Sequence, residues 1–314
     1  MIGFLLRRIL SVIPTMFIVF TVVFLLLHLI PGDPASSMLG AGASAEQIVE
    51  LRTHLGLDKP IYVQYVKYLI RAIHGDLGDS IFLKRPVVQA FMERVEPTIL
   101  LIVLGLVLAV LIGIPAGILS AVHPDSILDK SAMLFALLGV SIPTFWLGLN
   151  MIQAFSIHLD WFPASGYVPL SEGFLKTLQS LALPALSLAF NQAALFARIC
   201  RSSMLEVMQQ DYIRTARAKG VLEKWVILKH ALRNALLPTV TAVGTAFATL
   251  IGGTAVVEYV FNIPGAERLI ISSILRRDYA VIQGSVLIIS MAYVFINLVV
   301  DTIYGIIDPR VTYE

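Results

Sequence analysis

The sequence predicts an all-α membrane protein with about six transmembrane helices, because its composition is apolar and its apolar runs are long. Of the 314 residues, 57% are hydrophobic and 14% are charged, whereas about a quarter of the residues of a soluble domain are charged. A helix needs about 20 apolar residues to cross a bilayer. Six stretches reach that length: residues 9–30, 98–121, 132–158, 178–199, 239–257 and 281–307. We therefore expect lipid to be the main solvent of the chain.

The first of these stretches follows Arg7 and Arg8, and a secretory signal peptide begins in the same way. The small residues at 40–45 resemble a cleavage site. The apolar part of a signal peptide spans about 7–15 residues, however, and this stretch is longer. We interpret it as a membrane helix that is retained.

Glycine and proline recur within the apolar stretches, for example Gly105, Gly113, Gly117, Gly139 and Pro143. Membrane helices tolerate both residue types, and small residues allow neighbouring helices to approach closely. The pattern therefore predicts tight helix packing at these glycines.

Basic residues gather between the fourth and fifth stretches, and short basic loops lie in the cytoplasm. An even number of spans puts both termini on one side, so Arg7, Arg8 and Arg310 share the side of this segment. Arg268, Arg276 and Arg277 count against that orientation, as does the long loop at 31–97. We expect both termini to be cytoplasmic. The basic residues of the segment are Arg198, Arg201, Arg214, Arg217, Lys219, Lys224, Lys229 and Arg233.

The long loop after the first helix contains helical patterns of its own. Ile48, Leu51 and Leu55 are spaced as on one face of a helix, and a second apolar pattern begins at Ile61. Gly56 and Pro60 interrupt the two patterns. We expect short helices that cap the outer face, and the alternative is a surface connector. The predicted organisation is residues 1–95, with the first membrane helix and this extracytoplasmic region, and residues 96–308, with a core of five membrane helices.

A second helical pattern runs from Ser202 to Gly220. Met204, Met208, Tyr212 and Ala216 recur at every fourth position and form one apolar stripe. The basic residues Arg214, Arg217 and Lys219 lie away from the stripe, and Gly220 supplies a helix stop that accepts a positive φ. The sequence predicts a short amphipathic helix on the cytoplasmic face. A helix lying at the lipid headgroups would show the same periodicity.

The stretch DYIRTARAKG, followed by ALRNALLP, resembles the cytoplasmic "EAA" loop of permease subunits in binding-protein-dependent ABC importers. The form is that of the dipeptide, oligopeptide and nickel family, whose transmembrane domain is MetI-like. RRIL, HLIPGDP, LGLDKPIYVQY, SIPTFWLG, FNIPGAERL and NLVVDTIYGIIDPR resemble the same family in the same order. The resemblance spans essentially the whole chain. Arg214 and Thr215 depart from the general motif, in which Glu and Ala are usual.

The resemblance implies a type I ABC importer fold and a division of labour between subunits. A second, similar permease would complete the translocation path, two cytoplasmic ATPase subunits would drive it, and an extracytoplasmic binding protein would deliver the cargo. The segment 200–238, which we call the coupling loop, would dock onto an ATPase subunit. The docking residues implied are Asp211, Tyr212, Arg214, Thr215, Ala216, Arg217, Ala218, Lys219 and Gly220.

The chain is not expected to be an enzyme or to bind a cofactor itself. No G-x-x-x-x-G-K-[ST] phosphate-binding motif occurs in the sequence, so ATP and Mg²⁺ are expected on the partner subunits. The lone Cys200 cannot form an internal disulfide, and no Cys/His group has the spacing of a metal site. A net charge of +2 gives no indication of a nucleic-acid partner.

Polar residues at membrane depth are costly and suggest function. Asn297 and Asp301 are four residues apart and share a helix face. We expect a translocation path lined by Asn191, Gln192, Asn297 and Asp301, and the alternative is a set of hydrogen bonds between helices.

Two choices stay open on the sequence alone. The cargo is a dipeptide, an oligopeptide or a glutathione-like peptide, or alternatively nickel or a metal chelate. A secondary transporter driven by an ion gradient is the alternative of a different class, although inverted repeats or several buried carboxylates, which such proteins often show, are not evident here.

Overall fold

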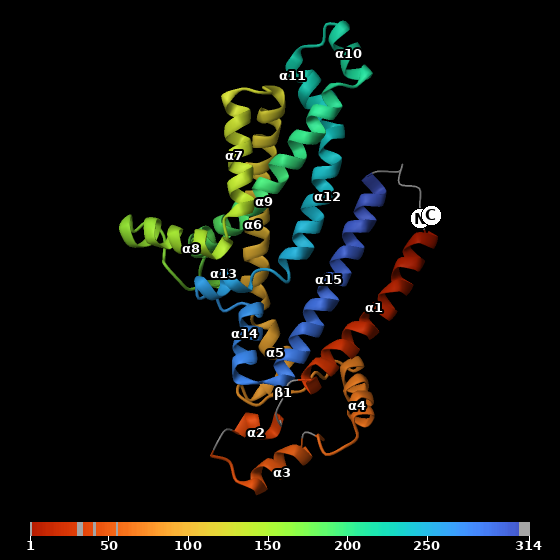
Figure 1. The fold of residues 1–314 in the computed structure, drawn as a ribbon, viewed down its shortest axis with the longest axis vertical. Helices are drawn as coiled ribbons and strands as arrows, with labels where there is room; N and C mark the ends of the chain where they lie inside the picture. Colours follow the sequence, from red (N-terminus) through yellow and green to blue (C-terminus); the bar gives the residue numbers. More distant parts are fainter. Residues whose placement is uncertain (1, 30–33, 40–41, 55, 308–314) are drawn as a thin grey trace. The chain divides into compact units, whose positions relative to one another are not determined.

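The computed structural model describes residues 2–29, 34–39, 42–54 and 56–307 (Figure 1). The chain forms two compact units. One contains Met1–Glu96 and Pro264–Phe295, and the other contains Pro97–Ile263 and Ile296–Glu314. The sequence placed a boundary near residue 95, but the first unit also takes in residues 264–295, which are remote in sequence.

The first unit combines the long helix α1 and the first part of α15 with several short helices around an apolar core. Its core side chains include Phe20, Val87, Phe91 and Leu269. The described segments of the loop at 31–97 form helices at the two predicted patterns, which confirms that this region has its own helical structure. The elements are α1 (Ile2–Leu29), α2 (Pro34–Leu39), α3 (Ala45–His54), α4 (Ile61–Ile73), β1 (Asp79–Ser80), β2 (Arg85–Pro86), α5 (Val87–Met92), α14 (Ala266–Arg276) and the first part of α15 (Tyr279–Ile307). β1 and β2 pair antiparallel, with Asp79 opposite Pro86.

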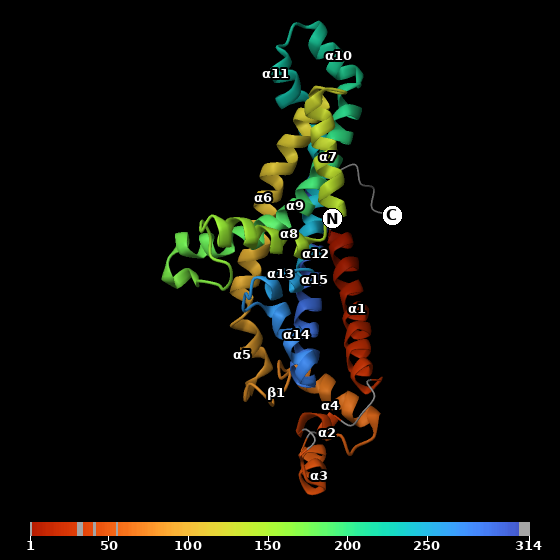
Figure 2. The same cartoon turned by 60° about the vertical axis from the view of Figure 1, so that its left-hand side comes forward.

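The second unit is a helical bundle in which α6, α7, α9 and α12 run beside one another (Figures 1 and 2). Its elements are α6 (Val95–Val122, which begins in the first unit), α7 (Ile127–Ser141), α8 (Thr144–Met151), η1 (Ile152–His158), η2 (Leu170–Glu172), α9 (Phe174–Met208), α10 (Asp211–Ala218), α11 (Glu223–Trp225), η3 (Val226–Ala231), α12 (Leu232–Leu250), α13 (Ala255–Val260) and the end of α15. The π-helical segment η1 continues α8. The π-helical segment η3 directly precedes α12.

Glycines on α6 and α7 bring these helices into close contact with α9. A Cβ on Gly113 would lie 2.5 Å from the carbonyl oxygen of Ala193, and one on Gly117 would lie 2.6 Å from that of Ala197. Gly139 on α7 packs against the Cβ of Ala194, and a Cβ on Gly139 would lie 3.1 Å from the carbonyl oxygen of Phe190. These contacts confirm the predicted tight packing, because only a residue without a side chain allows the two backbones to approach so closely.

The third apolar stretch, 132–158, is not the single helix that the sequence predicted. α7 ends at Ser141, and Ile142 is extended, with φ −83° and ψ 123°. Pro143 has no N–H and disfavours helix at the residue before it. The helical segment 144–158 therefore leaves α7 at an angle of 104°, and Figure 2 shows α8 leaving sideways. The periodic apolar pattern concealed this break.

Within the described residues, three helical segments are long and apolar enough to cross a membrane, or four if the bent pair counts as one span. The three are Val87–Val122, Phe174–Met208 and Tyr279–Val300. The two other predicted spans correspond to α1, whose described apolar part is Val12–Leu25, and to α12, which ends at Leu250 rather than at 257. The first turn of α12 contains Arg233 and Asn234, and the helix carries several threonines.

We predict that Gly113→Leu destabilises the bundle, because the added side chain must displace the α9 backbone. Overpacking of this kind costs about 1–3 kcal/mol. Thermal unfolding of the detergent-purified protein measures the effect. Gly252→Leu is the control, because a Cβ there meets nothing within 4 Å. Equal unfolding midpoints for the two variants would contradict the close approach.

Candidate functional site

The coupling loop leaves α9 through a sharp break. α9 ends at Met208, and Gln210 is extended, with φ −70° and ψ 150°. α10 then begins at Asp211, and its eight residues run to Ala218. The continuous helix predicted between Ser202 and Gly220 is therefore wrong, because Gln209 and Gln210 divide it into the end of α9 and a separate short helix.

The apolar face of α10 packs against its own chain. Ile213 is fully buried and Ala216 is 8% exposed. They share a core cluster with Met204 of α9, Val226 of η3 and Ala235 of α12. The short helix is thereby held at a fixed orientation by side chains from three other elements.

The opposite face of α10 is open. Asp211, Arg214 and Thr215 are exposed, as are Ala218 and Lys219. Because Ala216 is buried within the loop, it leaves no room for a partner side chain, which corrects the sequence expectation for that residue. The surface available to a partner is polar and carries both signs of charge, and Arg214 lies 3.4 Å from Asp211.

The end of α10 is closed by Gly220. Its φ is +76°, as the sequence predicted. The Gly220 N–H donates to the Arg217 carbonyl at 2.9 Å, and the Val221 N–H donates to the Ala216 carbonyl at 3.2 Å. This pair of bonds is the Schellman arrangement, which ends a helix and turns the chain back. Gly220 therefore fixes where the loop reverses.

Two further polar contacts stiffen the loop. Asn234 donates to the Tyr212 hydroxyl at 2.8 Å, and Arg217 pairs with Glu223 at 2.7 Å. The hydrogen bonds from Arg217 hold the pKa of Glu223 below its ordinary value. Because the folded-state pKa is depressed, this pair is present at neutral pH and is lost on acidification through the folded-state pKa.

Sequence comparisons place the chain in a family. Residues 113–313 match the family described as "Binding-protein-dependent transport system inner membrane component", and residues 1–102 match the N-terminal region of such membrane components. The chain belongs to this family. It is therefore an inner-membrane permease component of a binding-protein-dependent transport system.

Individual relatives agree with this assignment. A putative peptide transport system permease of Brucella abortus (strain 2308) is 47% identical over 314 residues, with 100% of both chains covered. The glutathione transport system permease GsiC of Escherichia coli (strain K12) is 44% identical over the same length and coverage.

Solved structures support the fold. Two crystal forms of the inward-facing MetNI methionine ABC transporter match with TM-scores of 0.55 and 0.57, at 21% and 18% identity. They cover 69% and 70% of this chain and 95% and 97% of theirs. The permease therefore has the type I importer, MetI-like fold that the sequence predicted.

The four residues expected along the path occupy different environments in the permease. Asn191 donates to the Gly139 carbonyl at 2.9 Å and so ties α9 to α7. Gln192 and Asn297 are partly buried, and the side chain of Asp301 lies outside the described ones. The contact of Asn191 is the interhelical hydrogen bond that the alternative interpretation expects.

Glu258 of α13 also contacts a second helix. It is fully buried, and it accepts hydrogen bonds from Thr98 at 2.6 Å and from Thr254 at 3.2 Å. A buried carboxyl of this kind links α13 to α6.

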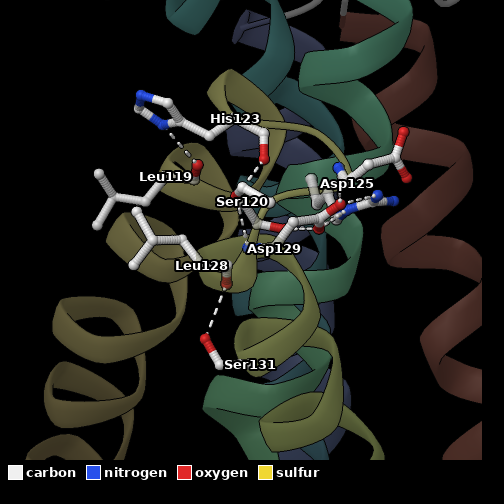
Figure 3. Close-up of polar contacts among 9 residues, drawn as sticks. Leu119, Ser120, His123, Asp125, Leu128, Asp129 and Ser131 are labelled. Carbon is white, nitrogen blue, oxygen red and sulfur yellow. Dashed lines mark hydrogen bonds and ion pairs between the residues drawn. The ribbon is translucent and has the colours of Figure 1, made fainter.

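Sequence reasoning missed a polar cluster at the turn between α6 and α7 (Figure 3). Asp129, in the first turn of α7, pairs with Arg201 of α9 at 2.6 Å and accepts a hydrogen bond from Ser120 of α6. Asp129 and Arg201 are 72 residues apart, so no local spacing predicts the pair. A partial signal was present, because Ser126 and Asp129 have the spacing of a helix N-terminus, and the Ser126 side chain does accept from the Asp129 N–H.

We predict that Gly220→Val leaves the permease in the membrane but abolishes solute uptake. A β-branched residue at φ +76° is strained by about 1–2 kcal/mol, and the strain falls on the turn that orients α10. Uptake in vesicles and limited proteolysis of the loop measure the effect.

Gly56→Val is the matched control for this prediction. Gly56 has φ +70°, and a Cβ there, as at Gly220, meets nothing within 4 Å. It carries the same backbone strain outside the coupling loop, so uptake is expected to persist. Normal uptake by the Gly220→Val permease would contradict the role of this turn.

Proposed function

We propose that this permease forms part of the translocation path of an ABC importer that carries peptides across the inner membrane. The proposal rests on one structural observation above others, the short helix α10, which is anchored by its apolar face and presents a polar face outward. A partner protein bound to the open polar face could displace α10, and the anchored apolar face would pass this displacement on to the bundle.

The cargo class follows from the relatives. Two permeases that match along their full length at 47% and 44% identity are named for a peptide and for glutathione, which is itself a small peptide. We therefore infer that the cargo is a dipeptide, an oligopeptide or a glutathione-like peptide. The extracytoplasmic binding protein would make most of the selection, and the permease would supply the passage.

Coupling to ATP is assigned to partner subunits. Two cytoplasmic ATPase subunits would bind ATP and Mg²⁺, and α10 would insert into a groove on one of them. The groove should accommodate Arg214 and Lys219, which are exposed. Arg217 already pairs with Glu223. Its charge is therefore less available to the ATPase groove than the charges of Arg214 and Lys219.

A second, homologous permease would complete the path, and lipid would surround the two. In this arrangement both termini and the coupling loop face the cytoplasm. The basic residues of the loop support that orientation, because positively charged short loops are retained on the cytoplasmic side.

Reconstitution tests the proposal directly. The permease is co-expressed with its partner permease and ATPase subunits, purified as a complex and placed in proteoliposomes with the binding protein and a labelled dipeptide. We predict uptake that requires ATP and all the subunits. Uptake driven by an ion gradient without ATP, or by the permease alone, would contradict the proposal.

A further inference from the structure

The carboxylate of Asp129 is saturated by donors from three parts of the bundle. Oδ1 accepts from the Ser120 hydroxyl at 2.5 Å and from Arg201 Nε at 2.6 Å. Oδ2 accepts from the other arm of the Arg201 guanidinium at 2.8 Å and from the Asp125 N–H at 3.0 Å. One buried side chain thus joins the end of α6, the turn at 123–126 and α9 (Figure 3).

Among the described residues this ion pair is the least exposed to water: the Asp129 side chain is buried, and that of Arg201 is 26% exposed. Asp129 is 4% exposed, and its contact with Arg201 is bidentate. Such a contact is strong and directional, and a buried charge that loses its partner is strongly disfavoured. The helices α7 and α9 therefore cannot slide past one another at this point without breaking the pair.

Arg201 lies beside the residues that anchor the coupling loop. Cys200 and Met204, on the same last turns of α9, are fully buried in the cluster that holds Ile213 and Ala216. α9 is continuous from Phe174 to Met208, so a displacement of α10 acts on the segment of α9 that carries Arg201.

α7 is attached to α9 at a second point ten residues further on. Asn191 of α9 donates to the Gly139 carbonyl of α7. The two attachments are about 15 Å apart along α7 at helical rise. Two separated polar contacts prevent rotation as well as sliding, and α7 ends shortly beyond the second of them, where the chain bends at Pro143.

We propose that Asp129 and Arg201 are positioning residues for energy coupling, and that their ion pair makes α7 move together with the coupling loop. The proposal rests on the proposed function, since it presumes that an ATPase displaces α10. The pair acts as a rigid joint between the loop's anchor on α9 and the helix that leads to the bend at Ile142–Pro143.

The test measures the number of ATP molecules hydrolysed per peptide imported by the reconstituted complex. Asp129→Asn keeps the shape of the side chain and removes its charge. We expect this ratio to rise about tenfold, within the range of about 5- to 150-fold that couplings between sites commonly reach. ATP hydrolysis itself should continue, because the docking face of α10 is untouched.

Asp76→Asn is the matched control. Asp76 forms a bidentate pair with Arg71 at 2.7 and 3.1 Å and also accepts a backbone N–H, from Gly78. That pair is about half exposed, and exposed pairs contribute little. We expect an unchanged ratio for this variant.

Arg201→Lys keeps the charge and loses the bidentate contact, so it should raise the ratio by less than Asp129→Asn. Arg201→Lys also provides the test of the ion pair if Asp129→Asn does not accumulate in the membrane. A ratio at the wild-type value in folded Asp129→Asn or Arg201→Lys protein would overturn the inference and leave the pair a folding contact. Failure of the wild-type complex to import with ATP would instead contradict the proposed function.

Discussion

The burial of Ile213 and Ala216 against their own chain is the constraint on which the proposed mechanism depends. A helix of eight residues has little stability by itself, since isolated helices shorter than about 12–15 residues are marginal in water. The cluster with Met204 and Val226 supplies the missing stability and also sets the direction in which α10 faces. A helix without this anchor would transmit no force, because it would reorient or unfold when a partner displaced it.

The helix α9 connects the anchor of the loop to the rest of the bundle. The same helix contributes Met204 to the loop cluster, Arg201 to the buried ion pair and Asn191 to the contact with α7. Its backbone also packs closely against glycines of α6 and α7. Close packing of this kind is stiff, because interiors at crystal-like density deform little. In the proposed mechanism, a stiff α9 would carry a displacement of the loop into the bundle.

The sequence was sufficient for those features that depend on local pattern. Apolar run length predicted the membrane class and most of the long helices, and Gly220 was correctly assigned a positive φ because few other residues accept one. Glycine positions also predicted where helices approach closely. Each of these conclusions follows from the chemistry of a residue and its near neighbours.

The features that were missed depend on contacts between remote residues or on a local break hidden by composition. Asp129 and Arg201 are 72 residues apart, and the spacing of Ser126 and Asp129 indicates a helix start but not the partner on α9. The break at Gln209–Gln210 interrupts an apolar stripe whose spacing is otherwise regular, and Pro143 breaks a stretch that remains apolar on both sides. For Asn191 the sequence left two roles open, and it could not show which carbonyl its amide contacts on a neighbouring helix.

The outward orientation of α10 is tested most directly by cross-linking two adjacent residues. Thr215 is exposed and Ala216 is buried, so cysteines at these positions report an exposed and a buried side of one helix, and the native Cys200 is buried and serves as the blank. In the assembled complex, a thiol-to-amine cross-linker should join Thr215→Cys to an ATPase subunit and leave Ala216→Cys unjoined. Equal cross-linking at both positions, or no cross-link from Thr215→Cys in a complex that imports peptide, would contradict the account.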